Sequence, residues 1–378
     1  MNKIKSIHYL RGVAALLVVA FHLRGIINNA YAQKNLGDLL FFSGPSGVDL
    51  FFIISGFIIA YSTAKNPTHA RSIFVVKRLF RVYPVYIICL AVFCLCIVPN
   101  DFQSFIRSAL LIHLDYTKEA PFFGYSLILP AWTLTYELYF YLVFLIAMSI
   151  SHNHRLMIAA VMLIVPMASL QVYYNGSVEL SGFTNLNGNP DIGFIKLLAS
   201  PMLLEFVYGM FFYWAMDYIK KVPHKNIIFF ACVSFSVCAF FARYRFGYGP
   251  LNFGLWAFVL FFGCMVYESG TEIRDNRVLN FLGDISYSLY ITHGAVNAIL
   301  ITKLSWIPIY NSGPGFAKMI FACAIFIVVA YITFNFIEKP FIKLGRKVCN
   351  KIASVRIFFL GGGDTPQYFL CHNSPINQ

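Results

Sequence analysis

The sequence contains little charge and few acidic groups. Only 12% of its 378 residues are charged, and 16 Asp and Glu stand against 29 Lys and Arg. A soluble domain carries about twice that share of charged residues, so this composition excludes a soluble globular fold. Hydrophobic residues make up 59% and aromatic residues 18% of the chain, with a mean hydropathy of +0.68. These values indicate a polytopic membrane protein with aromatic residues at the membrane interfaces.

Metal-binding, redox and nucleic-acid motifs are also missing. None of the nine cysteines has metal-ligand spacing, and the close pair Cys94 and Cys96 lies in lipid-depth sequence, so no metal or redox site is expected. No basic face stands clear of the apolar runs, so the net charge of +13 indicates positive-inside topology and contact with membrane lipids and other anions, not nucleic acid. Lys3 and Lys5 precede an apolar run that lacks a small-residue cleavage site, which predicts a retained helix.

What is present is a series of ten apolar runs that predict membrane-spanning helices. Most Lys and Arg residues fall on the side that holds both ends of the chain, which predicts an all-α bundle with both termini cytoplasmic. We expect residues 1–345 to form the membrane domain and residues 346–378 a basic, then poorly ordered, cytoplasmic tail. The runs cover residues 10–28, 44–63, 82–99, 127–150, 156–173, 196–216, 226–242, 250–268, 279–301 and 315–337.

Arg11 and His22 lie in the first run, eleven positions apart. Helical geometry places the two side chains within about 20° of each other and roughly 16 Å apart along the axis, which is about half of a bilayer core. The position of Arg11 is explained equally well by a functional role and by the positive-inside bias of membrane proteins, in which Arg11 would be an anchor at the cytoplasmic face. His22 has no such explanation, because ionisable groups at mid-depth are costly and usually functional. A neutral imidazole there is a candidate general base or nucleophile.

The second run opens with Asp49, in GVDLFFIISGFIIA. We expect Asp49 about two turns inside the outer face, near the depth of His22 in a neighbouring helix. An aspartate at that position can hold an imidazole in one tautomer and stabilise its protonated form, so Asp49 is a candidate catalytic residue. Ser55 is a candidate polar contact for an acceptor, although with Gly56 it also permits close helix packing.

A basic cluster, KRLFRVYP, stands at the inner end of the third run. Arg78 and Arg81 are three residues apart on a helix and can converge on one phosphate group, with Lys77 beside them. We therefore expect these residues to bind an anionic cytosolic ligand, although positive-inside bias also accounts for charge at this boundary. Pro84 is expected to begin the helix that follows.

Two later runs carry polar groups within apolar sequence. Glu137 lies near the outer end of the fourth run, where Trp132 and Tyr136 fit an interfacial aromatic belt but a carboxylate does not. In the ninth run, GDISYSLYITHG contains Tyr287 and His293. His293 is a second intramembrane histidine, while the hydroxyl groups near it are equally explained by helix packing.

Together these segments resemble acyltransferase family 3, whose members are membrane enzymes that acylate surface carbohydrates. The resemblance covers most of the chain and follows the family's order, through Arg11-x10-His22, GVDLFFIISGF, the paired Arg78 and Arg81 before YP, WTLTYELYFY, SYSLYITH and FIEKP. Two positions depart from the family pattern. Thr133 stands where serine is usual, and Leu138 stands where a second glutamate is common, so Glu137 is alone.

The resemblance implies a ten-helix core in the bacterial cytoplasmic membrane, acetyl-CoA as the usual donor, and a surface glycan such as O-antigen or exopolysaccharide, or its lipid-linked precursor, as acceptor. On this basis the CoA phosphates are expected on Arg11, Lys77, Arg78 and Arg81. His22 is then expected either to deprotonate an acceptor hydroxyl or to carry the acyl group itself. Asp49 would orient His22. The residues expected to bind or polarise the sugar from the outer side, or to support those that do, are Glu137, His293, Ser55, Trp132, Tyr136 and Tyr287.

Two hypotheses from other classes remain open at the level of sequence. A transporter or flippase for a lipid-linked sugar would use the same buried charges as a substrate path. A membrane-embedded scaffold or receptor is the other alternative. The sequence does not identify the acceptor hydroxyl, the length of the acyl group or the oligomeric state.

Overall fold

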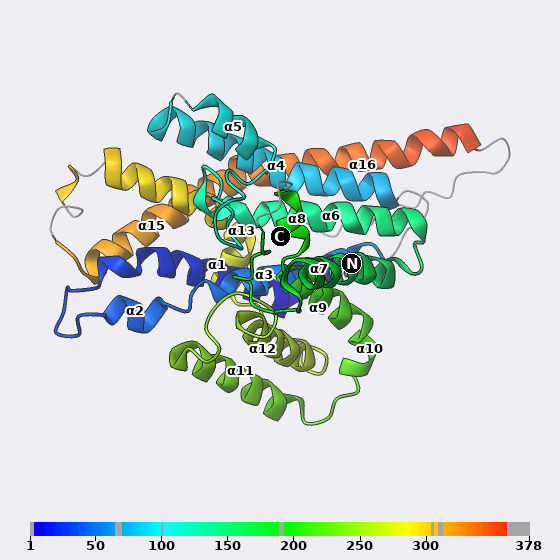
Figure 1. Ribbon diagram of the computed structural model, residues 1–378, viewed down its shortest axis with the longest axis horizontal. Coiled ribbons are helices and arrows are strands. Elements are labelled where there is room, and N and C mark those ends of the chain that lie inside the picture. The colour runs from blue at the N-terminus through cyan, green and yellow to red at the C-terminus, as the bar shows by residue number, and fades with distance from the viewer. Residues whose placement is uncertain are drawn as a thin grey trace.

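The computed structural model describes residues 4–64, 70–99, 101–188, 193–303, 306–308 and 313–360, which form helices and connecting turns without a strand (Figure 1). The helices longer than one or two turns are α1 (Lys5–Leu23), α3 (Ser46–Ser62), α4 (Ala70–Ile97), α5 (Phe102–Ala109), α6 (Trp132–Ile150), α7 (Arg155–Asn175), α9 (Leu203–Trp214), α11 (Lys225–Ala242), α12 (Phe253–Glu268), α13 (Arg277–Lys303), α15 (Phe316–Thr333) and α16 (Lys339–Leu360). The short elements are η1 (Arg24–Ile26), α2 (Leu36–Phe41), η2 (Leu129–Ala131), α8 (Phe194–Leu198), α10 (Met216–Ile219) and the π-helical turn η3 (Phe334–Glu338).

Eight stretches of the described chain are helical over at least 18 residues and apolar enough to cross a membrane. They coincide with eight of the ten predicted runs, and the other two runs coincide with α12 and α13. Helix α12 is apolar but only 16 residues long, whereas α13 has 27 residues and includes more polar side chains. The prediction of an all-α polytopic membrane protein is confirmed.

Helix α3 lies at the centre of the bundle. In the most apolar part of its span 78% of the residues are buried inside the protein, against 11% for peripheral α11. Helices α1, α9, α12 and α6 all pack against α3 (Figure 1). Polar side chains on α3 are therefore enclosed by protein rather than lipid, which makes them tolerable at this depth.

Two glycines bring α3 and α9 unusually close. A Cβ atom on Gly56 of α3 would lie 2.2 Å from the carbonyl oxygen of Phe206, and one on Gly209 of α9 would lie 2.1 Å from that of Ile53. Neither position has room for a side chain. Small residues allow backbones to approach in this way where lipid supplies no hydrophobic driving force.

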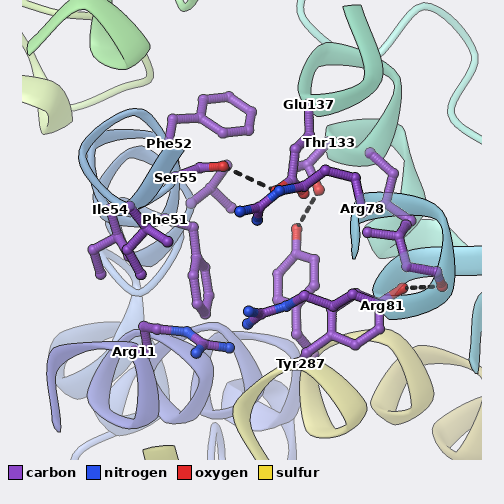
Figure 2. Close-up of a pocket in the computed structure, with 15 residues that line it drawn as sticks. Arg11, Phe51, Phe52, Ile54, Ser55, Arg78, Arg81, Thr133, Glu137 and Tyr287 are labelled. Atoms are coloured by element: carbon purple, nitrogen blue, oxygen red, sulfur yellow. Dashed lines mark hydrogen bonds between the residues drawn. The ribbon is translucent and has the colours of Figure 1, made fainter. Parts of the chain in front are cut away.

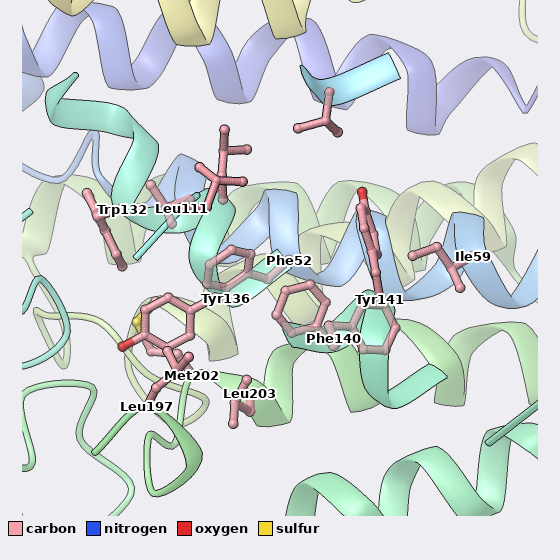
Figure 3. Close-up of a cluster of buried hydrophobic side chains, with 14 of the residues drawn as sticks. Phe52, Ile59, Leu111, Trp132, Tyr136, Phe140, Tyr141, Leu197, Met202 and Leu203 are labelled. Carbon is pink, nitrogen blue, oxygen red and sulfur yellow. The ribbon is translucent and has the colours of Figure 1, made fainter. Parts of the chain in front are cut away.

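Stacked aromatic rings join α6 to this central pair. Phe206 of α9 stacks on Phe52 of α3 at 4.6 Å and on Phe140 of α6 at 4.4 Å between ring centroids. Tyr136 of α6 lies 5.9 Å from Phe52 (Figure 3). Offset ring pairs of this kind add to the stabilisation gained by burial. They fix the rotation of α6, and with it the direction of Glu137 on the same helix.

The structure differs from two predictions about helix ends. Pro84 does not begin a helix, because α4 runs unbroken from Ala70 to Ile97 with Pro84 inside it. The last predicted run also continues past residue 337, through η3 into α16, which packs along α4. Residues 346–360 therefore belong to α16, and no boundary falls at residue 345. The part of the predicted tail after residue 360 lies outside the described residues.

Candidate functional site

An open cavity of about 720 Å³ lies between α1, α3, α4, α6 and α13, and three arginines line it (Figure 2). Arg11 comes from α1, and Arg78 and Arg81 come from successive turns of α4. Figure 2 shows the three side chains directed toward the same space. We call this space the arginine cavity. The paired arginines of α4 thus line one cavity together with Arg11.

The three guanidinium groups have few partners within the protein. Arg78 donates one long hydrogen bond, from Nη2 to Oγ of Ser62 at 3.4 Å, and its Nε has no acceptor. No hydrogen bond or ion pair of Arg11 or Arg81 is found among the described residues. Three like charges that share a cavity and have few hydrogen bonds of their own favour binding of an anion, and planar guanidinium groups suit phosphate or carboxylate.

Glu137 lies in this same cavity. Its Oε1 accepts a hydrogen bond from Oγ of Ser55 at 2.9 Å and another from the hydroxyl of Tyr141 (Figure 2). Sequence analysis placed Glu137 with the acceptor on the outer side, whereas the structure places it and Ser55 among the arginines. The difference arises because Glu137 lies more than one turn into α6, facing α3 and α4.

A second acid near the arginines is Glu338 in η3, which sequence analysis did not select. It is buried, accepts a hydrogen bond from Oγ of Ser288 at 2.7 Å, and lies close enough to Arg81 and Arg11 to interact electrostatically. The available signal was an acid at the end of an apolar run, in FIEKP. Two glutamates and three arginines leave this region with surplus positive charge when the carboxylates are ionised.

A second cavity of about 890 Å³ contains His22 and an unusual number of aromatic rings. Trp132, Phe122 and Tyr248 meet edge to face in its wall, with centroids 5.1 to 5.6 Å apart. We call this space the aromatic cavity. Pockets in which rings surround a few polar groups are typical of sites for small organic ligands. The other rings that line it belong to Phe21, Phe42, Tyr125, Phe183, Phe246, Phe253 and Tyr290.

His22 and His293 lie side by side at the aromatic cavity, with ring centroids 5.2 Å apart. Nδ1 of buried His293 lies 3.2 Å from the carbonyl oxygen of Leu289, and its Nε2 has no partner. A carbonyl only accepts, so Nδ1 carries the proton and Nε2 is left as an acceptor. No hydrogen bond of His22 is found among the described residues. This juxtaposition leaves His22 available to a ligand and places an acceptor nitrogen next to it.

The arginine cavity and the aromatic cavity meet at Val48 and Tyr290, which line both. The hydroxyl of Tyr290 interacts with Oγ1 of Thr133 at 3.0 Å and with the carbonyl oxygen of Pro130 at 3.2 Å, and its ring packs on Phe51. These contacts hold Tyr290 in place between the cavities. Arg11 and His22, on one face of α1, thus lie in two adjoining spaces.

Asp49 is not placed to orient His22. Its Oδ1 accepts the backbone N–H of Gly249 at 3.1 Å, and its carboxyl group lies next to that of Glu205 on α9, with no hydrogen-bond donor for Oδ2 or for either Glu205 oxygen among the described residues. Both acids are fully buried, and neither lines a cavity described above. Two ionised carboxylates repel each other when they are buried side by side, so this pair is expected to share a proton. Sequence analysis selected Asp49 but missed Glu205, an acid within the apolar segment LLEFVYG.

The remaining predicted residues divide between the two cavities and the core. Tyr287 lines the arginine cavity and donates its hydroxyl to the carbonyl of Val82 at 2.7 Å. Tyr136 is buried behind the aromatic cavity and donates to the carbonyl of Pro121 at 3.0 Å. Lys77 is exposed on α4 and does not line the arginine cavity. Its predicted association with the paired arginines is therefore not seen.

A further buried histidine, His113, supports the aromatic cavity from the loop between α5 and η2. Its Nε2 donates to the carbonyl of Trp132 at 3.3 Å, and its ring meets those of Tyr116, Phe123 and Tyr136. Burial lowers the pKa of His113 to about 4. The neutral ring thus fixes the backbone at Trp132, which lines the cavity.

Comparisons with known proteins identify the family of this chain. The acyltransferase domain of acyltransferase family 3 matches residues 4–335. The exopolysaccharide production protein ExoZ of Rhizobium meliloti (strain 1021) is 25% identical over 317 residues, which cover 80% of this chain and 91% of ExoZ. No solved structure matches significantly. The chain therefore belongs to acyltransferase family 3 and is a multi-pass membrane O-acyltransferase.

Proposed function

We propose that this protein transfers an acyl group, with acetyl as the expected group, from cytosolic acyl-CoA to a hydroxyl of exopolysaccharide or its lipid-linked precursor in the bacterial cytoplasmic membrane. The observation that carries the proposal is the meeting of the arginine cavity and the aromatic cavity at Val48 and Tyr290. One cavity suits an anionic donor, and the other suits an acceptor next to a histidine. The similarity to ExoZ supports exopolysaccharide as the acceptor.

The donor is expected to bind with its phosphates on the three arginines. Arg11, Arg78 and Arg81 line one cavity and have only one weak hydrogen bond, that of Arg78 to Ser62, among the described residues, so phosphate oxygens would supply the acceptors. Donor phosphates there would leave the thin pantetheine arm to extend along α1 toward His22. The roughly 16 Å of helix between Arg11 and His22 sets the distance that this arm must cover.

His22 is the expected base for direct transfer. The acceptor hydroxyl proton moves to a lone-pair nitrogen of His22 as the oxygen attacks the thioester carbonyl carbon. The C–S bond then breaks, and the leaving thiolate takes the proton from the imidazolium. Alternatively the nitrogen of His22 attacks the thioester first, and the thiolate leaves with the proton of the acylated imidazolium. The hydroxyl then attacks the acyl-imidazole, the C–N bond breaks, and the hydroxyl proton returns to the imidazole.

His293 is expected to position His22 in the role that sequence analysis gave to Asp49. Its Nε2 lone pair is unpartnered beside His22, because the other nitrogen is engaged by the carbonyl of Leu289. An N–H of His22 directed to this lone pair would leave the second nitrogen of His22 unprotonated toward the cavity. An acceptor nitrogen so placed selects a tautomer without adding a charge.

Replacement of His22 tests the proposal in cells. A strain lacking the gene is complemented with wild-type protein, with His22→Ala, or with His154→Ala as a control, since His154 is exposed and lies outside both cavities. Mass spectrometry of the surface polysaccharide measures ester-linked acyl groups. Wild type and His154→Ala are expected to restore them, and His22→Ala is expected to lack them at equal protein abundance.

The same experiment separates the transporter hypothesis. An acyltransferase lacking His22 leaves the amount and chain length of exported glycan unchanged, while its ester groups disappear. Reduced export with His22→Ala, or ester groups that persist in it, would contradict the proposal. A labelled acyl group on His22 under single-turnover conditions with labelled acetyl-CoA would select the covalent route.

A further inference from the structure

Arg24 in η1 is fixed at the aromatic cavity, two residues beyond His22. Its Nε donates to Oδ1 of Asp38 at 2.8 Å, its Nη1 donates to the carbonyl of Phe21 at 2.8 Å, and its Cζ lies 3.8 Å from the centroid of the Phe21 ring. Arg24 lines the cavity and is close enough to His22 to interact electrostatically. Its guanidinium group is therefore held in one place before any ligand binds.

Arg243, at the end of α11, lies beside the same aspartate. Its Nη2 donates to the backbone carbonyl of Asp38 at 2.8 Å, and its Cζ lies 4.5 Å from the centroid of the Phe42 ring. Phe42 in turn stacks on Phe246 at 4.9 Å, and both rings line the aromatic cavity. The backbone of Arg243 has a left-handed φ of +53°, which is unfavourable for a residue with a side chain. We call Arg24 and Arg243 the rim arginines.

The charges at the rim do not balance. Asp38 is the only acid that contacts the rim arginines in the described chain, and its two carboxylate oxygens are already engaged by Arg24 and by Nδ2 of Asn28. Arg243 reaches only the backbone carbonyl of Asp38 and forms no ion pair among the described residues. Two guanidinium groups thus share one carboxylate at the edge of the aromatic cavity.

Topology does not explain these two arginines. In the predicted orientation their end of the bundle faces outward, where positive-inside bias does not favour Lys or Arg. A solvated surface charge does not explain Arg24 either, because its side chain is 27% exposed and lines a cavity. A preorganised guanidinium group next to aromatic walls is instead suited to recognise an anionic substituent of a ligand.

From the rim arginines at the aromatic cavity, we propose that the acceptor is anionic and that a carboxylate or phosphate group on it binds Arg24 and Arg243. This inference rests on the proposed function and adds the chemical class of the acceptor. The charge has two possible sources: an acidic sugar or acidic substituent within the glycan, or the phosphate of a lipid-linked precursor. Both offer oxygen pairs that match the guanidinium fork.

Arg243→Gln tests the proposal with Arg245→Gln as the matched control. Arg245 is also exposed and also has a left-handed φ, of +49°, but it contacts the ring of Tyr244 and neither Asp38 nor Phe42. The acceptor is the cell's own glycan in its lipid-linked form, freed of ester groups by mild alkali. It is used intact, after reduction of its carboxyl groups, or after removal of its phosphate groups. Transfer from labelled acetyl-CoA gives the kinetics, and equilibrium dialysis gives binding without catalysis.

For wild-type protein, one of the two neutralising treatments is expected to weaken glycan binding and raise the acceptor KM about tenfold, the effect of one lost charge-assisted hydrogen bond. Arg243→Gln is expected to show the same rise with intact glycan, no further rise with the neutralised glycan, and an unchanged donor KM. Equal binding of intact and neutralised glycans, or equal effects of Arg243→Gln and Arg245→Gln, would overturn the inference. Binding that follows this pattern without any acyl transfer would refute the proposed function alone.

Discussion

Asn in place of Asp49 is expected to retain function, and Ala at the same position is expected to lose it. Asp49 and Glu205 form an adjacent buried carboxyl pair that is expected to share a proton, and Asp49 also accepts the N–H of Gly249. In Asp49→Asn, Oδ1 still accepts from Gly249 and the amide N–H replaces the shared proton toward Glu205. Asp49→Ala leaves both the Gly249 N–H and the Glu205 carboxyl group without that partner.

The size of the effect follows from these two contacts. A buried polar group left without a partner costs about 1–3 kcal/mol, so Asp49→Ala is expected to destabilise the protein by about 2–6 kcal/mol if both costs add. The damage is expected at one place in particular. Gly249 belongs to the turn that carries Gly247 and Tyr248, and these two residues line the aromatic cavity.

Three measurements test this reasoning. Denaturant titration in detergent compares the stability of wild type, Asp49→Asn and Asp49→Ala, and hydrogen exchange compares protection of residues 247–252. Acyl transfer is then measured for each variant. Asp49→Asn is expected to resemble wild type in all three, and Glu205→Gln to resemble Asp49→Asn. If Asp49→Asn keeps stability and protection but loses as much transfer as Asp49→Ala, a charged Asp49 is required, and the sequence-based catalytic role is correct.

Three further predictions address the arginine cavity, the loop histidine and helix packing. Arg81→Gln is expected to raise the KM for acyl-CoA about ten- to a hundredfold, since a hydrogen bond to a charged group contributes about 1.5–3 kcal/mol; a KM within twofold of wild type would place the donor phosphates elsewhere. Because burial lowers the pKa of His113 to about 4, below the usual value of about 6.5, stability is expected to fall as pH decreases through that interval. Thermal melting at pH 7 and 5 should show a smaller loss for His113→Gln, and equal losses would contradict this assignment. Gly209→Ala is expected to cost about 1–3 kcal/mol by overpacking, because its Cβ would lie 2.1 Å from the carbonyl oxygen of Ile53, while Gly25→Ala meets nothing within 4 Å. Denaturant titration compares the two variants, and similar stabilities would argue against the close approach of α3 and α9.

Hydropathy and helical periodicity predicted which segments form helices better than they predicted which helices and side chains pack together. All ten runs are helices, and the eleven-residue spacing on α1 correctly separated Arg11 from His22 along one face. The partners were harder to predict. Asp49 was assigned to His22 by depth alone, but depth does not fix how α3 is rotated about its axis. Lipid and protein interior are equally apolar, so an apolar pattern does not specify which helix face meets which neighbour.

The site residues that sequence analysis missed have one property in common. Glu205 and Glu338 are single acids within or at the end of apolar segments, without a recognisable motif around them. The free-energy cost of burying an ionisable side chain within the membrane is the only signal that marks such residues as functional candidates. Their roles depend on contacts more than forty residues away in sequence, with Asp49 and with Ser288. His113 lies outside the predicted spans, so the cost of an ionisable group at membrane depth gave no reason to select it.

The placement of Tyr290 between the two cavities has a consequence for how an acyl group crosses the membrane. Under the proposed mechanism, the thin pantetheine arm reaches past this residue and only the acyl group remains beyond it, while the charged phosphates of the donor stay on the side where they bound. A group of that size needs neither an ion gradient nor two rocking halves to cross the barrier. The same tyrosine, pinned by Thr133 and Pro130, would leave the membrane sealed to ions during each turnover. Acyl transfer beside Tyr290 would then take the place of the conformational cycle by which a transporter moves its substrate across the membrane.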